Sequence, residues 1–537
     1  MTQFDILIAG YGPVGATMAN LLGRAGFSVA IADRYAEIYD KPRAITVDHE
    51  IIRCWQACGL ADEIAQNIGI HAGTDYLGVE QQIIKIFNPA PPPFPLGWPP
   101  AITFVQPELE ASLRDGVKRL ANVTEYLGYD VKLAGENADG VAATLTPVEG
   151  QARGAAPDEI RCKYLLACDG ANSSIRNACG IAIEDLGFNE WWIVIDAHAR
   201  DLSKIRKRSA QYCYPSRPGT LIIGPGNLRR WEIKLLPGET PDTFRTNESL
   251  RDVLKNFVDP DVLDIWRYAI YQFHAVVADD WRKGNVFLMG DAAHRMPPFL
   301  GQGLCAGVRD AYNFAWKLQQ VEHNGAAPAL LDSYRAERRP HVKTVVANAK
   351  QFGLIIGELD LEKARERDRK LGDELASGTA ETIRSRFIPD LATGLLARKG
   401  TGEDAPLAKA AGSLFVQPRV LDAEGTERLL DDVTGYRFLL AASEEAVGAL
   451  SDEALAQWDK LGGLVVAMDT ARKPARTHSA GRMALSETDG LFAAWRQNTG
   501  FEIAIVRPDR YVYGGAHDAT EAARLVAGLH GAMFGIQ

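Results

Sequence analysis

The stretch Phe4-Asp5-Ile6-Leu7-Ile8-Ala9-Gly10-Tyr11-Gly12-Pro13-Val14-Gly15 decides the fold. It opens with an apolar run typical of a buried strand, and closely spaced glycines follow at once. Helical sequence continues to about Arg24, Gly26 ends it, and the apolar run Ser28 to Ala32 predicts a second strand. The chain therefore begins with a βαβ unit whose first turn carries the pattern Gly-x-Gly-x-x-Gly.

This glycine pattern, between a strand and a helix, predicts a dinucleotide site. The glycines permit a tight turn and let the backbone approach a pyrophosphate at the helix N-terminus. Asp33 ends the second strand, where a carboxylate can accept hydrogen bonds from ribose hydroxyls. The motif alone leaves FAD and NAD as alternatives. The candidate contacts in this unit are Gly10, Gly12, Pro13, Val14, Gly15, Asp33 and Arg34.

Composition excludes several other classes of protein. The 537 residues include 59 basic and 69 acidic ones, a formal charge of -10, which argues against nucleic acid or an anionic membrane as main partner. The seven cysteines show no zinc spacing, so we expect free thiols, no metal site and a cytoplasmic protein. The N-terminus lacks the basic region of a signal peptide, and no apolar stretch approaches the ~20 residues of a membrane span.

Two distant segments indicate which dinucleotide is bound. Cys168 to Arg176, with the sequence CDGANSSIR, and Gly290 to His294, with the sequence GDAAH, each follow a predicted strand. With the glycine turn, they resemble in order and sequence the class A flavoprotein hydroxylases of the para-hydroxybenzoate hydroxylase type. Residues 40–44 (DKPRA) and 104–107 (FVQP) are similar to the 3-(3-hydroxyphenyl)propionate hydroxylase and phenol hydroxylase branch. The resemblance extends over about residues 4–345.

The resemblance implies bound FAD, with NADPH or NADH as a transient co-substrate. Asp169 and Gly170 would lie between the flavin and nicotinamide sites. Asp291 would contact the ribityl chain, and Arg43 and Gln106 would touch the flavin. Backbone amides at the start of the helix near residue 303 would stabilise negative charge on it. The further cofactor candidates are therefore Arg43, Gln106, Asp169, Gly170, Gly290, Asp291, Pro298, Gly301, Gly303 and Leu304.

The fold expected from the sequence and the resemblance is α/β, with three parts. A Rossmann-like FAD-binding domain is predicted over 1–80, 101–180 and 276–350. It is interleaved with a mixed β-sheet substrate domain, over 81–100 and 181–275. A helical segment and linker follow at 351–409. Residues 410–537 resemble a thioredoxin-like α/β domain, which contains no cysteine and so no thiol redox function.

The activity implied is hydroxylation of a phenolic ring, ortho or para to the existing hydroxyl, with oxygen transferred from a flavin C4a-hydroperoxide. Because a phenolate is a better nucleophile than a phenol, a base should assist, and His274 and Tyr271 are the candidates. A hydroxyphenylpropionate-like phenolic acid is the first candidate substrate, and a homodimer is compatible with the sequence. Candidate substrate contacts are Trp192, Tyr212, Tyr214, Arg217, Phe299 and Leu300.

Several alternatives stay open. Within the hydroxylases, resorcinol, nitrocatechol and polyketide-type phenols are other substrates to consider. A flavin-dependent halogenase would carry Trp-x-Trp-x-Ile-Pro, which Glu190 to Val194 does not match. An FAD oxidase, or a flavoprotein scaffold without catalysis, remains as a further alternative.

Overall fold

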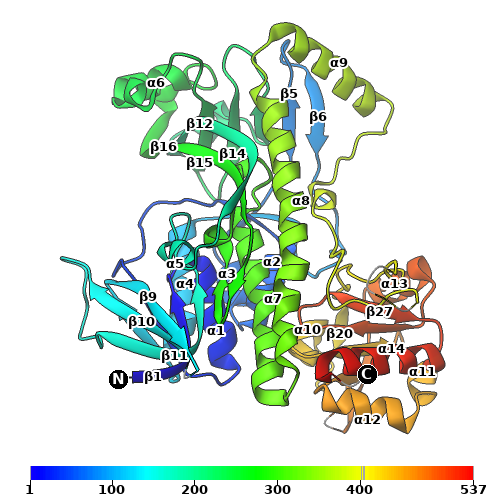
Figure 1. The fold of residues 1–537 in the computed structure, drawn as a ribbon. Coiled ribbons are helices and arrows are strands. Elements are labelled where there is room, and N and C mark those ends of the chain that lie inside the picture. Colours follow the sequence, from blue (N-terminus) through cyan, green and yellow to red (C-terminus); the bar gives the residue numbers. More distant parts are fainter. Residues whose placement is uncertain (1, 139, 401, 403–404, 480, 536–537) are drawn as a thin grey trace.

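The computed structural model describes residues 2–138, 140–400, 402, 405–479 and 481–535. Figure 1 shows three regions: a sheet with helices around the N-terminus, a second sheet above it, and a C-terminal domain at the lower right. No helix in the described part of the chain is long and apolar enough to cross a membrane.

The first sheet confirms the predicted βαβ start. β1 (Thr2–Ala9), α1 (Pro13–Arg24) and β2 (Val29–Asp33) form the unit, and β1 pairs in parallel with both β2 and β11. The strand order is β17-β18-β11-β1-β2-β8, with β10 and β9 joined to β11. Because β2, β1, β11 and β18 are parallel, their carboxyl ends meet at one edge. The other strands are β8 (Val123–Leu127), β9 (Tyr129–Asn137), β10 (Gly140–Pro147), β11 (Glu159–Ala167), β17 (Arg282–Lys283) and β18 (Val286–Leu288).

Helices and a small sheet surround this core. α1 packs against α4 (Gln106–Lys118) and the long α7 (Gly303–Asn324). Residues 40–66 contain a short strand followed by two helices. β3 (Thr46–Asp48) comes first, and the Asp48 side chain then caps α2 (His49–Ala57). The remaining elements here are α3 (Ala61–Ala65), β4 (Ile68–Ile70), β7 (Ala101–Phe104) and α5 (Ser174–Ala178).

The second sheet has the order β19-β16-β12-β15-β14-β13-β5-β6 and confirms the predicted mixed sheet. Its boundary differs from the prediction, because β5 (Thr74–Leu77) already pairs with β13, before residue 81. β19 (His294–Arg295) also joins it from the region assigned to the FAD-binding domain. The other elements are β6 (Ile83–Phe87), β12 (Ile183–Ala199), β13 (Ser209–Tyr212), β14 (Gly219–Ile223), β15 (Leu228–Lys234), α6 (Asn247–Leu254) and β16 (Leu263–Ala278).

Two helices lead from these sheets to the C-terminal domain. α8 (Asp332–Gly357) continues through Pro340 and rises beside the second sheet, and α9 (Leu361–Ala376) crosses the top (Figure 1). In the C-terminal sheet, β23-β22-β26-β27 are neighbours, the first pair parallel and the others antiparallel. This order is compatible with the thioredoxin-like prediction.

The elements of the C-terminal domain alternate between helices and strands. They are β20 (Arg419–Leu421), β21 (Glu427–Leu429), α10 (Leu430–Thr434), β22 (Leu439–Ala442), α11 (Glu444–Gly448), α12 (Asp452–Lys460), β23 (Leu464–Asp469), β24 (Arg476–Ser479), β25 (Arg482–Ser486), α13 (Leu491–Thr499), β26 (Ile503–Val506), β27 (Val512–Ala516) and α14 (Ala519–Phe534).

Candidate active site

The three glycines of the first turn are required for different reasons. A Cβ on Gly10, where φ is +101°, would lie 2.2 Å from the Cys168 carbonyl oxygen, so this turn packs against the end of β11. A Cβ on Gly15 would lie 2.0 Å from the Gly10 carbonyl oxygen. A Cβ on Gly12 would meet no protein atom within 4 Å. Gly10 and Gly15 thus allow the turn itself, whereas Gly12 keeps the space beside the start of α1 free for a ligand.

The neighbouring strand end carries Asp33. Its carboxylate accepts hydrogen bonds from the Tyr11 amide at 2.6 Å and the Tyr35 amide at 2.8 Å, which fixes it beside the glycine turn. Each oxygen keeps a further lone pair for a ribose hydroxyl. Arg34 is exposed and lies 3.5 Å from Asp130, at the outer side of this edge.

The Asp169-Gly170 turn lies next to the glycine turn. Asp169 accepts a hydrogen bond from the Ile175 amide at 3.3 Å, while its other oxygen is enclosed without a partner. Burial raises the pKa of this carboxyl. Arg176 bonds to the Ala292 carbonyl at 3.0 Å and so ties this turn to the Gly290 segment.

The Gly290-Asp291 turn packs directly on the start of α1. A Cβ on Gly290 would lie 3.1 Å from Val14 Cγ2, and one on Gly307 of α7 would lie 2.6 Å from the same atom. Asp291 is exposed although Gly290 and Ala292 are buried. The surrounding protein raises the pKa of this carboxyl through desolvation, and His294 and Arg43 oppose the rise. The Asp291 carboxylate is therefore open to water but surrounded by protein. It lies in a recess, where it can contact a ligand.

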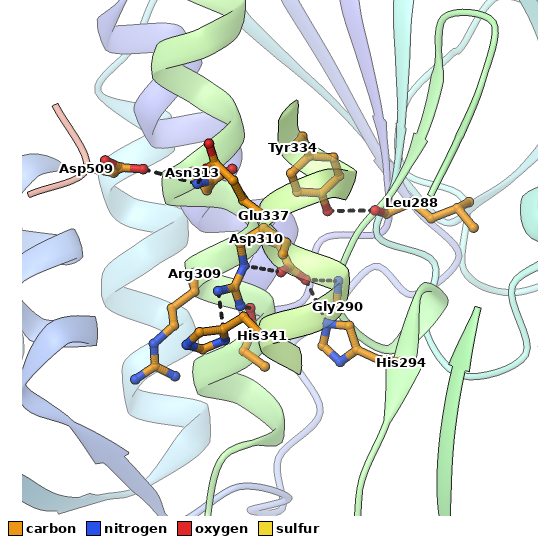
Figure 2. Close-up of polar contacts among 12 residues, drawn as sticks. Leu288, Gly290, His294, Arg309, Asp310, Asn313, Tyr334, Glu337, His341 and Asp509 are labelled. Carbon is orange, nitrogen blue, oxygen red and sulfur yellow. Dashed lines mark hydrogen bonds and ion pairs between the residues drawn. The ribbon is translucent and has the colours of Figure 1, made fainter. Parts of the chain in front are cut away.

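Asp310 of α7 holds the Gly290 turn (Figure 2). Its Oδ2 accepts hydrogen bonds from the Gly290 amide at 3.1 Å and pairs with His294 Nε2 at 2.7 Å. Its Oδ1 accepts from Arg338 Nε at 3.0 Å. His294 and Asp310 side chains are fully buried. His294, buried and paired with Asp310, is therefore not placed to act as a base.

A second cluster positions Arg43. Arg230 pairs with the buried Asp196 and donates to the carbonyl oxygens of Pro42 at 3.0 Å and Arg43 at 2.6 Å. Arg267 adds a bond to the Pro42 carbonyl at 2.8 Å. The carbonyl oxygen of the buried Gln106 side chain accepts from the Arg43 amide at 3.1 Å, while its amide group donates to Glu110 at 2.6 Å. The Arg43 backbone is fixed from both sides, and its side chain stays exposed.

The segment before α7 is the last part of the cofactor site. Gly301 has φ +60°, and a Cβ there would lie 2.1 Å from Thr46 Oγ1. No side chain caps the α7 N-terminus, so the first amides, at Gly303 and Leu304, are available to an anion. Gln302 is held by Arg309 at 2.8 Å, which leaves this backbone little freedom.

These residues fit FAD. The open position at Gly12, the uncapped α7 and the recessed Asp291 offer contacts for a pyrophosphate, an electron-rich ring and a polyhydroxyl chain respectively. The predicted cofactor residues lie along one edge of the first sheet and the α7 N-terminus. Pro298 and Gly301 also line the adjacent pocket.

That pocket lies between the second sheet and the segment Pro298 to Gly301. One wall is formed by side chains of β5, β6, β13, β14 and β15, and Arg384 closes it from the region after α9. The lining is unusually polar for an interior site. The residues are Thr46, His71, Thr74, Tyr76, Phe87, Ser209, Gln211, Thr220, Ile222, Glu232, Pro298, Phe299, Gly301 and Arg384.

Glu232 is the candidate acid–base group of the pocket. It is 3% exposed, and burial raises its pKa to about 7, with Arg230 opposing and Asp196 adding to the rise. A carboxyl group with a pKa near the working pH suits proton transfer. Within the described residues, no hydrogen bond or ion pair occupies this carboxylate.

His71 is a poorer candidate. Its Nδ1 accepts from the Gly73 amide at 3.0 Å, so the proton of the neutral ring lies on Nε2 and is directed to Ser209 Oγ at 3.3 Å. Burial lowers the pKa of His71 to about 3. The ring is therefore neutral at physiological pH and has no free acceptor.

The structure brings only part of the predicted substrate set to this pocket. Phe299 lines it, and Trp192 packs behind Phe299 with ring centroids 5.0 Å apart. Leu300 belongs to the core. Tyr212 faces the other side of β13, where it packs on Phe257 at 4.8 Å and on Tyr214, past the strand end, at 5.6 Å.

Arg217 is also absent from the pocket lining. Its guanidinium forms an ion pair with Glu239 at 2.7 Å. Packing for Tyr212 and Tyr214, and an ion pair for Arg217, therefore describe these side chains better than substrate contact.

The two predicted catalytic residues lie elsewhere. Tyr271 and His274 are three residues apart in a regular part of β16, so they point to opposite faces of the sheet. Tyr271 is 39% exposed and accepts a hydrogen bond from Arg267. Desolvation lowers the pKa of His274, and Arg295 adds to this. Neither Tyr271 nor His274 lines the pocket, whereas Glu232 does.

Strand alternation was the signal that could have found Glu232. Arg230 and Glu232 share one face of β15, and Gln211 and Thr220 lie opposite them on β13 and β14. No local signal marks Arg384, because it reaches the pocket from a segment distant in sequence.

Comparison with known proteins agrees with this geometry. Residues 3–349 match the family model described as "FAD binding domain", and residues 412–532 match the "HcaD C-terminal domain". The chain is 31% identical to 3-(3-hydroxy-phenyl)propionate/3-hydroxycinnamic acid hydroxylase of Comamonas testosteroni, over 95% of this chain and 93% of the relative. The enzyme of the same name from Escherichia coli K12 is also 31% identical, over 95% and 91% respectively.

Solved structures share the whole fold. The flavin-dependent monooxygenase PieE, in complex with FAD and substrate, superposes with a TM-score of 0.77 at 20% identity, over 99% of both chains. Aklavinone-11 hydroxylase, solved with FAD and aklavinone, has a TM-score of 0.76 at 21% identity, over 99% of both chains.

Fold and site together define an FAD-dependent monooxygenase, and the chain belongs to the class A flavoprotein aromatic hydroxylases. Within that family it is a homologue of the 3-(3-hydroxyphenyl)propionate hydroxylases.

Proposed function

We propose that the protein hydroxylates a phenolic acid of the hydroxyphenylpropionate type, ortho or para to its hydroxyl, with FAD, a reduced nicotinamide and oxygen. The observation that carries the proposal is the pocket beside the Pro298–Gly301 segment, which contains a buried carboxylate with a pKa near 7. The names of the relatives support the choice of a phenolic acid.

The residues at the strand edge would hold the cofactor. Gly12, the α1 and α7 N-termini, Asp33 and Asp291 would bind FAD, with Arg43 and the Gln106-supported backbone beside the flavin. The chemistry that bound FAD supplies is acceptance of hydride and activation of oxygen.

The chain's own contribution is to bind, orient and deprotonate the phenol. Glu232, when ionised, accepts the phenolic proton on a carboxylate oxygen, which increases electron density at the ring carbons ortho and para to the oxygen. Phe299, backed by Trp192, forms an apolar wall against the ring and limits access of water. His71, neutral and bonded to Ser209, orders this side of the pocket.

Glu232 replaces His274 and Tyr271 as the proposed deprotonating group, since neither of those lines the pocket. A single dinucleotide motif suits a nicotinamide that docks transiently, and either NADPH or NADH is compatible with it. A homodimer and a cytoplasmic location stay predictions.

The test is nicotinamide oxidation by FAD-loaded protein across a panel of phenols, with hydroxylated product and hydrogen peroxide both quantified. The panel contains phenolic acids, resorcinol, a nitrocatechol and a polycyclic phenol, each with NADPH and NADH. We expect a phenolic acid to accelerate oxidation and to appear as a hydroxylated product with little peroxide. A preference for resorcinol or a polycyclic phenol would overturn the substrate class, and peroxide alone with all phenols would favour an oxidase.

A further inference from the structure

Arg384 is a partly buried cation that lines the pocket and has no ion-pair partner among the described residues. Its Nη2 is enclosed and has no hydrogen-bond partner, and burial lowers the pKa of its guanidinium. Asp48, whose charge acts on Arg384, is already bonded to Arg309 and to Gln302 at 3.1 Å. No ion pair to Arg384 occurs within the described residues.

Several buried arginines of this protein have a carboxylate partner, and others, such as Arg229, donate to backbone carbonyls instead. Arg230 binds Asp196, Arg338 binds Asp310 and Arg507 binds Glu337, each with N–O distances of 3.0 Å or less. For Arg384, desolvation outweighs the favourable interactions with Cys305, Asp48 and Tyr76, so its charge is only partly compensated by the chain. Such a group is expected where a ligand supplies the negative charge.

The segment around Arg384 is held firmly. The Thr382 carbonyl accepts a hydrogen bond from the Asn88 amide at 2.9 Å, and the Phe387 carbonyl accepts one from Asn348 at 2.8 Å. The Phe387 ring packs on Phe87 and Phe352, at 5.6 and 5.0 Å. Arg384 is therefore placed in advance, beside Gly301, where a Cβ would lie 3.8 Å from its Nη1.

The two charges of the pocket come from different walls. Glu232 extends from the second sheet and Arg384 from the opposite connection, and no ion pair joins them. A substrate carboxylate would be repelled near Glu232 and attracted by Arg384. A guanidinium also matches a carboxylate with two parallel hydrogen bonds.

We propose that Arg384 binds the carboxylate of the phenolic acid and makes the pocket select acids over neutral phenols. This rests on the proposed function for its substrate class. It also fixes an orientation, because the carboxylate at Arg384 leaves the phenolic hydroxyl for Glu232 on the other wall.

The test compares Arg384→Met with Arg384→Lys and with Arg386→Met as a matched control. Arg386 lies two residues further, is exposed, and pairs only with Glu381. Steady-state hydroxylation is measured with 3-(3-hydroxyphenyl)propionate and with its neutral amide. We expect Arg384→Met to raise KM for the acid on the order of 100-fold and to change KM for the amide by no more than about 3-fold. Arg384→Lys should recover part of the acid preference, and Arg386→Met should match the wild type.

A binding measurement separates this inference from the proposed function. Titration with 3-phenylpropionate, which has the carboxylate but no hydroxyl, is followed by the visible absorbance of the bound flavin and needs no turnover. Weaker binding in Arg384→Met, with unchanged FAD content, supports the anchor even if hydroxylation fails. Equal losses for acid and amide, or unchanged binding of 3-phenylpropionate, would overturn it.

Discussion

Tyr511 of the C-terminal domain donates a 2.8 Å hydrogen bond to Glu50 Oε1, and the other oxygen of Glu50 binds Arg309. Arg309 in turn holds Gln302, the residue before α7, at 2.8 Å. The buried side chains of Tyr511, Glu50 and Arg309 thus connect the C-terminal domain with the N-terminus of α7, which we assign to the cofactor site. A domain without cysteines therefore has a structural reason to be present beside the flavin site.

Removing this connection should weaken both the fold and the cofactor site. Tyr511→Phe leaves a buried carboxylate oxygen without its donor, which should lower the free energy of unfolding by about 1.5–3 kcal/mol. We also expect the dissociation constant of FAD to rise a few-fold. Thermal unfolding and FAD titration measure the two effects. Tyr513→Phe is the control, because no hydrogen bond to the Tyr513 hydroxyl occurs among the described residues; equal effects of both changes would contradict the account.

Glu232 should control the pH dependence of turnover. Its pKa is raised to about 7, and only the ionised form can accept the phenolic proton, so kcat should increase as the pH rises through about 7. In Glu232→Gln we expect kcat to fall about 100-fold or more and the inflection to disappear. Glu232→Asp should retain an inflection. An unchanged pH profile in Glu232→Gln would assign the base elsewhere.

The same group should affect stability in the opposite direction. The folded protein raises the pKa of Glu232 from 4.5 to about 7, so it binds this proton more tightly than the unfolded chain does. The free energy of unfolding should therefore fall as the pH rises from about 4.5 to about 7, by roughly 3 kcal/mol in total. Glu232→Gln should lose this dependence and be more stable than the wild type above pH 7. Urea unfolding at several pH values, with both proteins, measures the difference.

The two glycines flanking Pro13-Val14 should respond differently to alanine. Gly12→Ala adds a Cβ that meets no protein atom, so the apoprotein should keep its melting temperature while FAD binds at least tenfold more weakly. Gly15→Ala places a Cβ 2.0 Å from the Gly10 carbonyl oxygen, so the turn itself must shift and the melting temperature should fall. Loss of stability in Gly12→Ala with normal FAD binding would contradict the assignment of the pyrophosphate position.

Asp310 should be essential for the Gly290 turn. Asp310→Asn removes the charge that pairs with Arg338 and bonds to His294 and the Gly290 amide, all in the interior. We expect a loss of about 3–5 kcal/mol in the free energy of unfolding and protein that purifies without FAD. Denaturant unfolding and the ratio of flavin to protein absorbance are the measurements. A variant of normal stability that retains FAD would exclude this function of Asp310.

The cofactor half of the site could be predicted because its signals are local. Gly10, Asp169 and Asp291 each come shortly after the end of a strand, and parallel strands bring their ends to one edge. The substrate half of the site depends on which face of each strand lines the pocket and which face packs against the rest of the domain. Gln211 enters the pocket while its neighbour Tyr212 packs on Phe257. Tyr212 was predicted because its hydroxyl could bind a phenol, but it lies on the face of β13 that points away from the pocket. Arg384 could not be placed, since only the packing of Phe387 on distant residues brings it there.

The central claim is that this chain inserts one atom of molecular oxygen into a phenolic acid. The most direct measurement is mass spectrometry of the product formed from 3-(3-hydroxyphenyl)propionate under isotopically labelled oxygen gas, with FAD and reduced nicotinamide. The account predicts a dihydroxylated acid that contains one labelled oxygen, formed in proportion to the nicotinamide consumed. A product without label, or consumption of nicotinamide that yields hydrogen peroxide alone, would contradict it.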